Sequence, residues 1–205
     1  MALATYTDLL ASVATWINRS DLTAVIPDFV ALAESRLSRD LRLRKQVSAT
    51  TLSTVANTRG VTLPTDFLEL ENISISSTTP QAAMSVVTPE ILDRKYPDTY
   101  SVGQPVVYAL LGDQILFGPT PDGVYTIAID YYARFTALST TPTNWLLTNH
   151  PGLYLFPTLA EAHLYMMDQA QASIWEQRYQ AAVDSLQSTD DESLRSGSAM
   201  RVRVL

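Results

Sequence analysis

The chain has 205 residues, of which 46% are hydrophobic, and it carries a formal net charge of −7 at pH 7 and no cysteine. This length suits one domain, or one domain with an insertion, and the missing cysteine excludes disulfides and thiol chemistry. The acidic balance argues against tight nucleic-acid binding over the whole surface. No apolar run reaches the roughly 18 residues of a membrane span, so we do not expect a membrane protein. The first ten residues lack the basic region of a signal peptide, so we do not expect a secreted protein.

Two helices are expected at the N-terminus. Thr5 and Asp8 stand at the capping-box spacing that begins a helix over residues 6–17. A second helix is predicted over residues 27–45, because proline suits the first helical turn. Apolar residues recur along it at helical spacing: Phe29, Val30, Ala33, Leu37 and Leu41. Two such helices form a hairpin that needs a further apolar surface to cover its stripes.

The second predicted helix ends in a cluster of positive charge. Its cations are Arg36, Arg39, Arg42, Arg44 and Lys45. One interpretation is a solvated helix end, partly compensated by Asp40; a second is contact with the carboxylates of a neighbouring subunit. The third is phosphate contact with DNA, which the net charge places last, although a ring of identical chains would repeat these cations and create a local field.

The middle of the chain reads as β-rich. Strands are predicted at residues 46–54, 61–63, 68–75, 105–111, 114–117 and 124–134. The first two are expected to pair as a hairpin, and Gly112-Asp113 is the two-residue loop of another. Thr88-Pro89-Glu90 predicts a short helix. The strand at 124–134 has two fairly apolar faces, which is typical of a central strand.

Helical periodicity returns near Asn149. One helix is predicted to start there and another at Gln169, capped by Asp168, with helicity fading over residues 188–192. Residues 193–205, SLRSGSAMRVRVL, hold three arginines and no acid, and we expect a tail. Their closing alternation of arginine and valine would suit a strand added to the sheet edge of another protein.

The predicted fold class is therefore α+β. Helices from the two ends of the chain form one bundle, which carries a β-rich insertion and an extended C-terminal tail. The predicted parts are residues 1–45, the N-terminal hairpin; 46–135, the β-rich insertion; 136–192, the C-terminal helices; and 193–205, the C-terminal extension.

Catalytic motifs are missing from the sequence. There is no P-loop, dinucleotide fingerprint or nucleophile elbow, and we predict no enzyme, no cofactor and no metal. His163 is expected on the inner face of a helix, and carboxylates gathered around it would indicate otherwise. Tyr125, Tyr131 and Tyr132 could line a glycan-binding surface, although aromatic strand residues more often belong to a core.

Several stretches, in order along the chain, resemble the head-to-tail adaptor (head-completion, or connector) proteins of tailed bacteriophages. They are YTDLLASVATWINRSDLTAVIPDFVALAESRLSRDLR, LPTDFLELENI, FGPTPDG, IDYYARFTALS and NWLLTNHPGLYLFPTLAEA, followed by WEQRYQAAVDSL. None is a mechanistic signature alone. Their shared order from about residue 6 to residue 187 makes the resemblance specific.

The resemblance implies a structural protein of the virion neck, assembled in the host cytoplasm. Such a protein forms a homo-oligomeric ring, twelve copies if it matches the portal protein above it. The ring extends the channel through which packaged DNA passes without specific binding, and it offers a platform to tail nozzle or tail completion proteins. The alternatives are a stopper or another tail-tube or nozzle protein and, from a different class, the glycan-binding module.

The resemblance also implies that the C-terminal extension reaches the portal. The expected portal-binding residues are Arg195, Met200, Arg201, Val202, Arg203, Val204 and Leu205. The cations from Arg36 to Lys45 become candidates first for subunit or portal contacts and second for DNA contacts.

Overall fold

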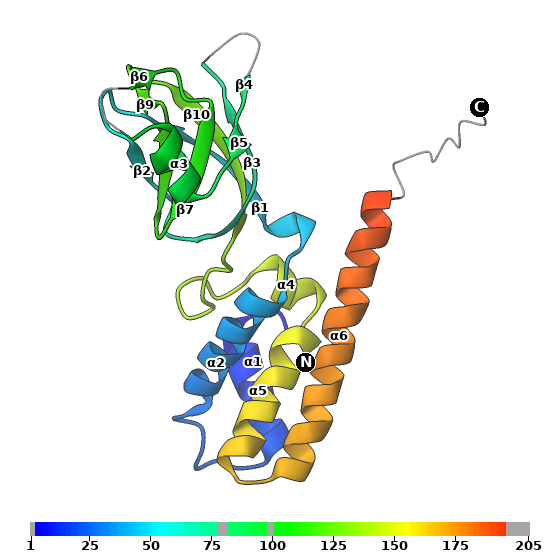
Figure 1. Ribbon diagram of the computed structural model, residues 1–205. Coiled ribbons are helices and arrows are strands. Elements are labelled where there is room, and N and C mark those ends of the chain that lie inside the picture. Colours follow the sequence, from blue (N-terminus) through cyan, green and yellow to red (C-terminus); the bar gives the residue numbers. More distant parts are fainter. Residues whose placement is uncertain (1–2, 78–81, 98–100, 196–205) are drawn as a thin grey trace, which may run out of the picture. The chain divides into compact units, whose positions relative to one another are not determined.

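A computed structural model describes residues 3–77, 82–97 and 101–195 (Figure 1). The chain divides into two compact units: Met1–Arg44 together with Phe135–Leu205, and Lys45–Arg134. Helices at both ends of the chain form the first unit, and sheets dominate the second. The predicted α+β class, with terminal helices that pack together and a β-rich middle, is confirmed. The predicted extension beyond Arg195 lies outside the described residues.

The helical unit joins both ends of the chain around one core. Its helices are α1 (Tyr6–Ile17), α2 (Ile26–Asp40), α4 (Trp145–Asn149), α5 (Gly152–Tyr165) and α6 (Gln169–Arg195). α5 packs against α1, α2 and α6, so the N-terminal stripes are covered by C-terminal helices. The Thr5 and Asp8 capping box is present at the start of α1. All five apolar residues of the second predicted stripe are buried.

Three helix boundaries differ from the sequence prediction. α2 ends at Asp40 rather than residue 45, and Leu41 is extended. A separate short helix, α4, precedes α5, because Asn144 accepts a hydrogen bond from the Leu147 N–H and caps it. The prediction of fading helicity over residues 188–192 is wrong, since α6 continues to Arg195.

In the described residues of the β-rich unit, the strands form two four-stranded sheets and a two-stranded sheet, accompanied by one α-helix. Its elements are β1 (Val47–Ser53), β2 (Gly60–Thr62), β3 (Phe67–Ile75), β4 (Ala82–Ala83), β5 (Ser85–Val86), α3 (Pro89–Lys95), β6 (Val102–Gly103), β7 (Val107–Leu111), β8 (Gln114–Gly118), β9 (Thr120–Pro121) and β10 (Thr126–Ala133). The strand orders are β1-β10-β3-β4, β2-β8-β7-β5 and β6-β9. A shared apolar core contains Ile73 and Ile129 from the first sheet and Phe117 from the second.

Strand pairing both confirms and corrects the predictions. β7 and β8 form the predicted hairpin around Gly112, whose φ of 57° is a left-handed conformation that glycine adopts easily. β10 lies between β1 and β3, as predicted for a central strand. The expected hairpin of β1 with β2 is wrong: β1 pairs over its whole length with β10, and β2 pairs with β8 in the other sheet.

Candidate functional site

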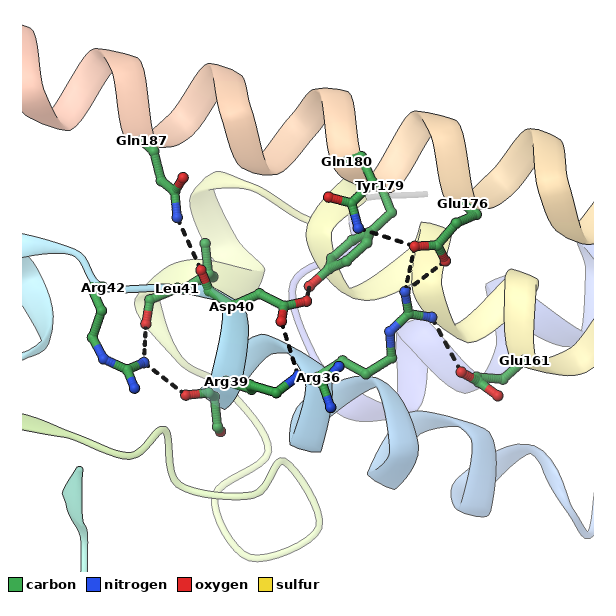
Figure 2. A network of polar contacts seen from close by, with 11 residues as sticks. Arg36, Arg39, Asp40, Leu41, Arg42, Glu161, Glu176, Tyr179, Gln180 and Gln187 are labelled. Carbon is green, nitrogen blue, oxygen red and sulfur yellow. Dashed lines mark hydrogen bonds and ion pairs between the residues drawn. The ribbon is translucent and has the colours of Figure 1, made fainter. Parts of the chain in front are cut away.

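The cation cluster at the end of α2 is divided by the fold into internal and exposed parts. Arg36 points into the bundle, where its Nη2 donates to both Glu176 carboxylate oxygens at 2.6 Å and its Nη1 donates to Glu161 Oε1 at 3.2 Å (Figure 2). Its guanidinium carbon lies 4.9 Å from the centre of the Tyr179 ring. Arg36 thus ties α2 to α5 and α6 through side chains of its own chain.

The electrostatics of this contact favour the ionised pair. Burial pulls the pKa of Arg36 down, but the carboxylates of Glu176 and Glu161 outweigh it and the net shift is upward. Burial likewise acts to raise the pKa of Glu176, and the hydrogen bonds from Arg36 and Gln180 turn the net shift downward. Only 18% of the Arg36 side chain is exposed, so this charge is shielded from solvent and from other molecules.

Asp40 explains why α2 ends before the rest of the cluster. Its Oδ2 accepts the Tyr179 hydroxyl at 2.8 Å, and its backbone carbonyl accepts Gln187 Nε2 at 2.9 Å (Figure 2). Both partners come from α6, so side chains of another helix hold the last turn of α2. Burial, followed by the contact with Asp40, raises the pKa of Tyr179.

The remaining cations surround this end of α2. Arg42 Nη1 donates to the carbonyls of Ser38 and Leu41 at 2.9 and 2.7 Å, which satisfies carbonyls at the helix terminus. The backbone N–H of Arg44 donates to Asp190 Oδ2 on α6 at 2.8 Å. Arg44 and Lys45 have exposed side chains, and Arg39 is 71% exposed beside Asp40. The cluster therefore presents Arg39, Arg44 and Lys45 to solvent, while Arg36 serves the bundle.

Of the predicted portal-binding residues, the structure describes only Arg195. Arg195 is the last residue of α6, and Met200, Arg201, Val202, Arg203, Val204 and Leu205 lie outside the described residues. The role expected of them remains a prediction.

The three strand tyrosines do not line one surface. Tyr131 is buried, and its hydroxyl donates to Asp66 Oδ1 at 3.0 Å. Tyr125 and Tyr132 are half-buried. Tyr125 directly precedes β10 and packs against the apolar core, whereas Tyr132 within β10 alternates with the buried Tyr131 and so faces the other side of the sheet. This arrangement does not support a glycan-stacking platform.

His163 lies beside the carboxylate of Asp168. Its Nδ1 lies 3.7 Å from Asp168 Oδ2, and its side chain is mostly buried near the end of α5. Among the residues that the structure describes, no three His, Cys, Asp or Glu side chains gather as a metal site. No helix in the described part of the chain is long and apolar enough to cross a membrane.

Sequence reasoning missed a carboxylate that anchors the chain where it re-enters the bundle. Glu34 Oε1 accepts the backbone N–H of Leu138 at 2.7 Å, and burial raises its pKa. Nearby, Asn144 Nδ2 donates to the Tyr154 hydroxyl at 2.6 Å, and burial raises the pKa of Tyr154 to about 12. The residues in each contact come together only when the chain folds, so their spacing in the sequence did not predict either contact.

A comparison with models of protein families identifies a match. The sequence model of the family described as SU10 adaptor protein matches residues 4–203, nearly the whole chain. No curated protein matches the chain at a significant level.

Proposed function

Since the chain belongs to the SU10 adaptor protein family, phage adaptors with a structural rather than a catalytic role, we propose that it is the head-to-tail adaptor of a tailed phage. It forms a homo-oligomeric ring under the portal protein, twelve copies if it follows the portal, and its place is the virion neck. The ring extends the DNA channel and offers the attachment platform for tail nozzle or tail completion proteins. The family match over residues 4–203 carries this proposal.

The exposed charges supply a lateral contact for the ring. Arg39, Arg44 and Lys45 are each exposed, and α6 carries exposed acids at Asp184, Asp191 and Glu192. A ring repeats one heterologous contact, so a basic patch on one copy can meet the acidic side of α6 on the next. The excess of acid over base in the whole chain would let DNA pass through the channel without binding tightly.

The C-terminal extension is proposed to attach each copy to the portal. Residues 193–205, of which the first three end α6, carry three arginines and no acid, so a contact with the portal surface would use cationic and apolar side chains. Deleting them should leave a folded protein that no longer co-sediments with its portal. The triple change of Arg39, Arg44 and Lys45 to Glu should leave portal attachment and prevent ring closure, as seen by electron microscopy of the complex.

Two outcomes would reject parts of this proposal. If the truncated chain still binds the portal, the extension is not the attachment segment. If the ring sits away from the portal in a reconstructed particle, the protein is a stopper or a nozzle component instead.

A further inference from the structure

One edge of the β-rich unit stands out from the other sheet edges. β1 is seven residues long and lies at the edge of its sheet, whereas the edge strands β2, β4 and β5 have only three, two and two residues. Proteins usually protect an edge by shortening it or by adding charge, proline or a bulge. β1, VSATTLS, carries neither a charge nor a proline, and its register with β10 is unbroken.

The hydrogen-bond register shows which backbone groups face outward. The Thr54 N–H donates to the Tyr125 carbonyl at 3.0 Å, so even-numbered residues of β1 direct their backbone groups toward β10. Val47, Ala49, Thr51 and Ser53 therefore direct their N–H and C=O groups away from β10. In the part of the chain that the structure describes, no strand pairs with this side of β1.

The two faces beside this edge differ in chemistry. On the exposed face, the side chains next to the edge are small. Asp130 and Glu69 stand on the same face of the next two strands, and Asp130 Oδ2 accepts a hydrogen bond from Asn72 Nδ2 at 3.1 Å. On the opposite face Leu52 packs at the margin of the apolar core. An added strand would therefore gain from cations on one face and apolar side chains on the other.

The C-terminal sequence has this alternation. Arg201 and Arg203 would share one face of an extended strand, with Val202 and Val204 on the other. An arginine opposite Ala49 on the added strand would lie two strands, or about 10 Å, from Asp130. Because the side chain of Ala49 is only a methyl group, it would not block the arginine side chain from reaching across β1 toward Asp130. The ten residues after Arg195 span up to about 33 Å when extended, enough to cover β1.

We propose that the C-terminal segment of a second copy of this chain adds as an edge strand to β1. Its valines extend the apolar layer beside Leu52, and its arginines lie over the acidic exposed face. The inference goes beyond the adaptor role, and any one copy of the segment can serve either β1 or the portal. Pairing between free copies would therefore compete with portal attachment.

The test uses the full chain and the synthetic peptide SGSAMRVRVL, residues 196–205, labelled with a fluorophore. Binding should be saturable and should weaken with salt, because it is partly ionic. Thr51→Pro should weaken it at least tenfold, because proline removes an outward N–H without removing a bond to β10. Thr51→Val is the matched control and should bind as the unchanged chain does. A peptide in which Arg201 and Arg203 are Glu should not bind.

If Thr51→Pro distorts β1 itself, a cross-linking experiment tests the same proposal without that substitution. The sequence has no cysteine, so Thr51→Cys and Leu205→Cys chains can be mixed under mild oxidation without background thiols. A disulfide-linked heterodimer is expected, and Thr62→Cys on the edge strand β2 should give none. Equal cross-linking of both positions, or unchanged peptide binding by Thr51→Pro, would overturn the proposal while leaving the portal experiment unaffected.

Discussion

Arg36 on α2 donates two hydrogen bonds of 2.6 Å to the carboxylate of Glu176 on α6, a residue 140 positions later in the sequence. The same guanidinium reaches Glu161 on α5. The Arg36 side chain thus joins three helices of the bundle, and its charge is paired with carboxylates of the same chain.

Replacing Arg36 by Ala should destabilise the helical unit by about 1–2 kcal/mol, because charged hydrogen bonds are lost and two half-buried carboxylates keep no cation beside them. The matched control is Arg39→Ala, whose side chain is 71% exposed. That change should shift stability by less than about 0.5 kcal/mol. Urea unfolding followed by circular dichroism measures the free energy of unfolding of both variants. Equal losses of stability would mean that the buried ion pairs of Arg36 do not contribute more than the exposed contact of Arg39.

Leu37→Asp should unfold the helical unit, because Leu37 is 1% exposed and a carboxylate there would have no partner in the apolar core. Leu32→Asp on the same helix is the control, since Leu32 is 51% exposed. All three tryptophans, Trp16, Trp145 and Trp175, belong to the helical unit, so their fluorescence reports its melting. A Leu37→Asp chain that melts like the unchanged protein would contradict the assigned buried face.

Gly118→Ala should destabilise the β-rich unit by about 1–3 kcal/mol through overpacking. A Cβ at this position would come within 2.5 Å of Leu92 Cδ1 and 2.7 Å of Tyr96 Cδ2, both from the α3 region. Gly123→Ala is the control, because a Cβ there meets no atom within 4 Å. Hydrogen exchange followed by mass spectrometry should show faster exchange in β7, β8 and α3 for the first variant only.

Glu34 should give the helical unit a component of pH dependence with a definite sign. Burial raises its pKa in the folded state above the ordinary 4.5, so the native state holds the proton to higher pH and the carboxylate destabilises it as pH rises through the shifted value. Glu34→Gln removes this titration while keeping an oxygen for the Leu138 N–H.

The Glu34→Gln variant should therefore be more stable than the unchanged chain at neutral pH, and the difference should vanish below the ordinary glutamate pKa. The measurement is the difference in unfolding free energy between the two proteins, taken between pH 4 and pH 7. This difference isolates the contribution of Glu34 to the pH dependence of stability from that of other groups, such as Glu176, whose lowered pKa makes stability rise with pH instead. A Glu34→Gln chain that is less stable than the unchanged chain at neutral pH, by a deficit that shrinks as the pH falls, would show that Glu34 is stabilised as the carboxylate instead.

Local signals in the sequence were sufficient for much of the fold. The capping box at Thr5, the apolar stripe from Phe29 to Leu41 and the Gly112-Asp113 turn each act over a few residues, and each appears in the structure. The end of α2 could not be predicted in this way. The residues after Asp40 look helical, but side chains from α6 hold the helix terminus and Leu43 is buried beyond it.

The candidate site shows the same limit. Composition identified the cation cluster, yet whether a cation faces solvent or a carboxylate depends on which helix packs beside it. Arg36 and Arg39 are three positions apart on one helix, and only Arg36 meets the acids of α5 and α6. Similarly, neighbouring positions in the sequence predicted that β1 and β2 pair, whereas β1 pairs with β10 and β2 with β8, both of which lie far along the chain.

The pairing of β1 with β10 has a consequence for the order of folding. Val47 lies opposite Tyr132 in this ladder, so the ladder brings together the two points at which the chain leaves and rejoins the helical unit. Without it, the bundle would have to close a loop of about 90 residues; with it, the effective loop is only a few residues long. The entropic cost of closing the bundle then falls by about 3 kcal/mol, so a chain in which this ladder has formed closes its helical bundle more readily.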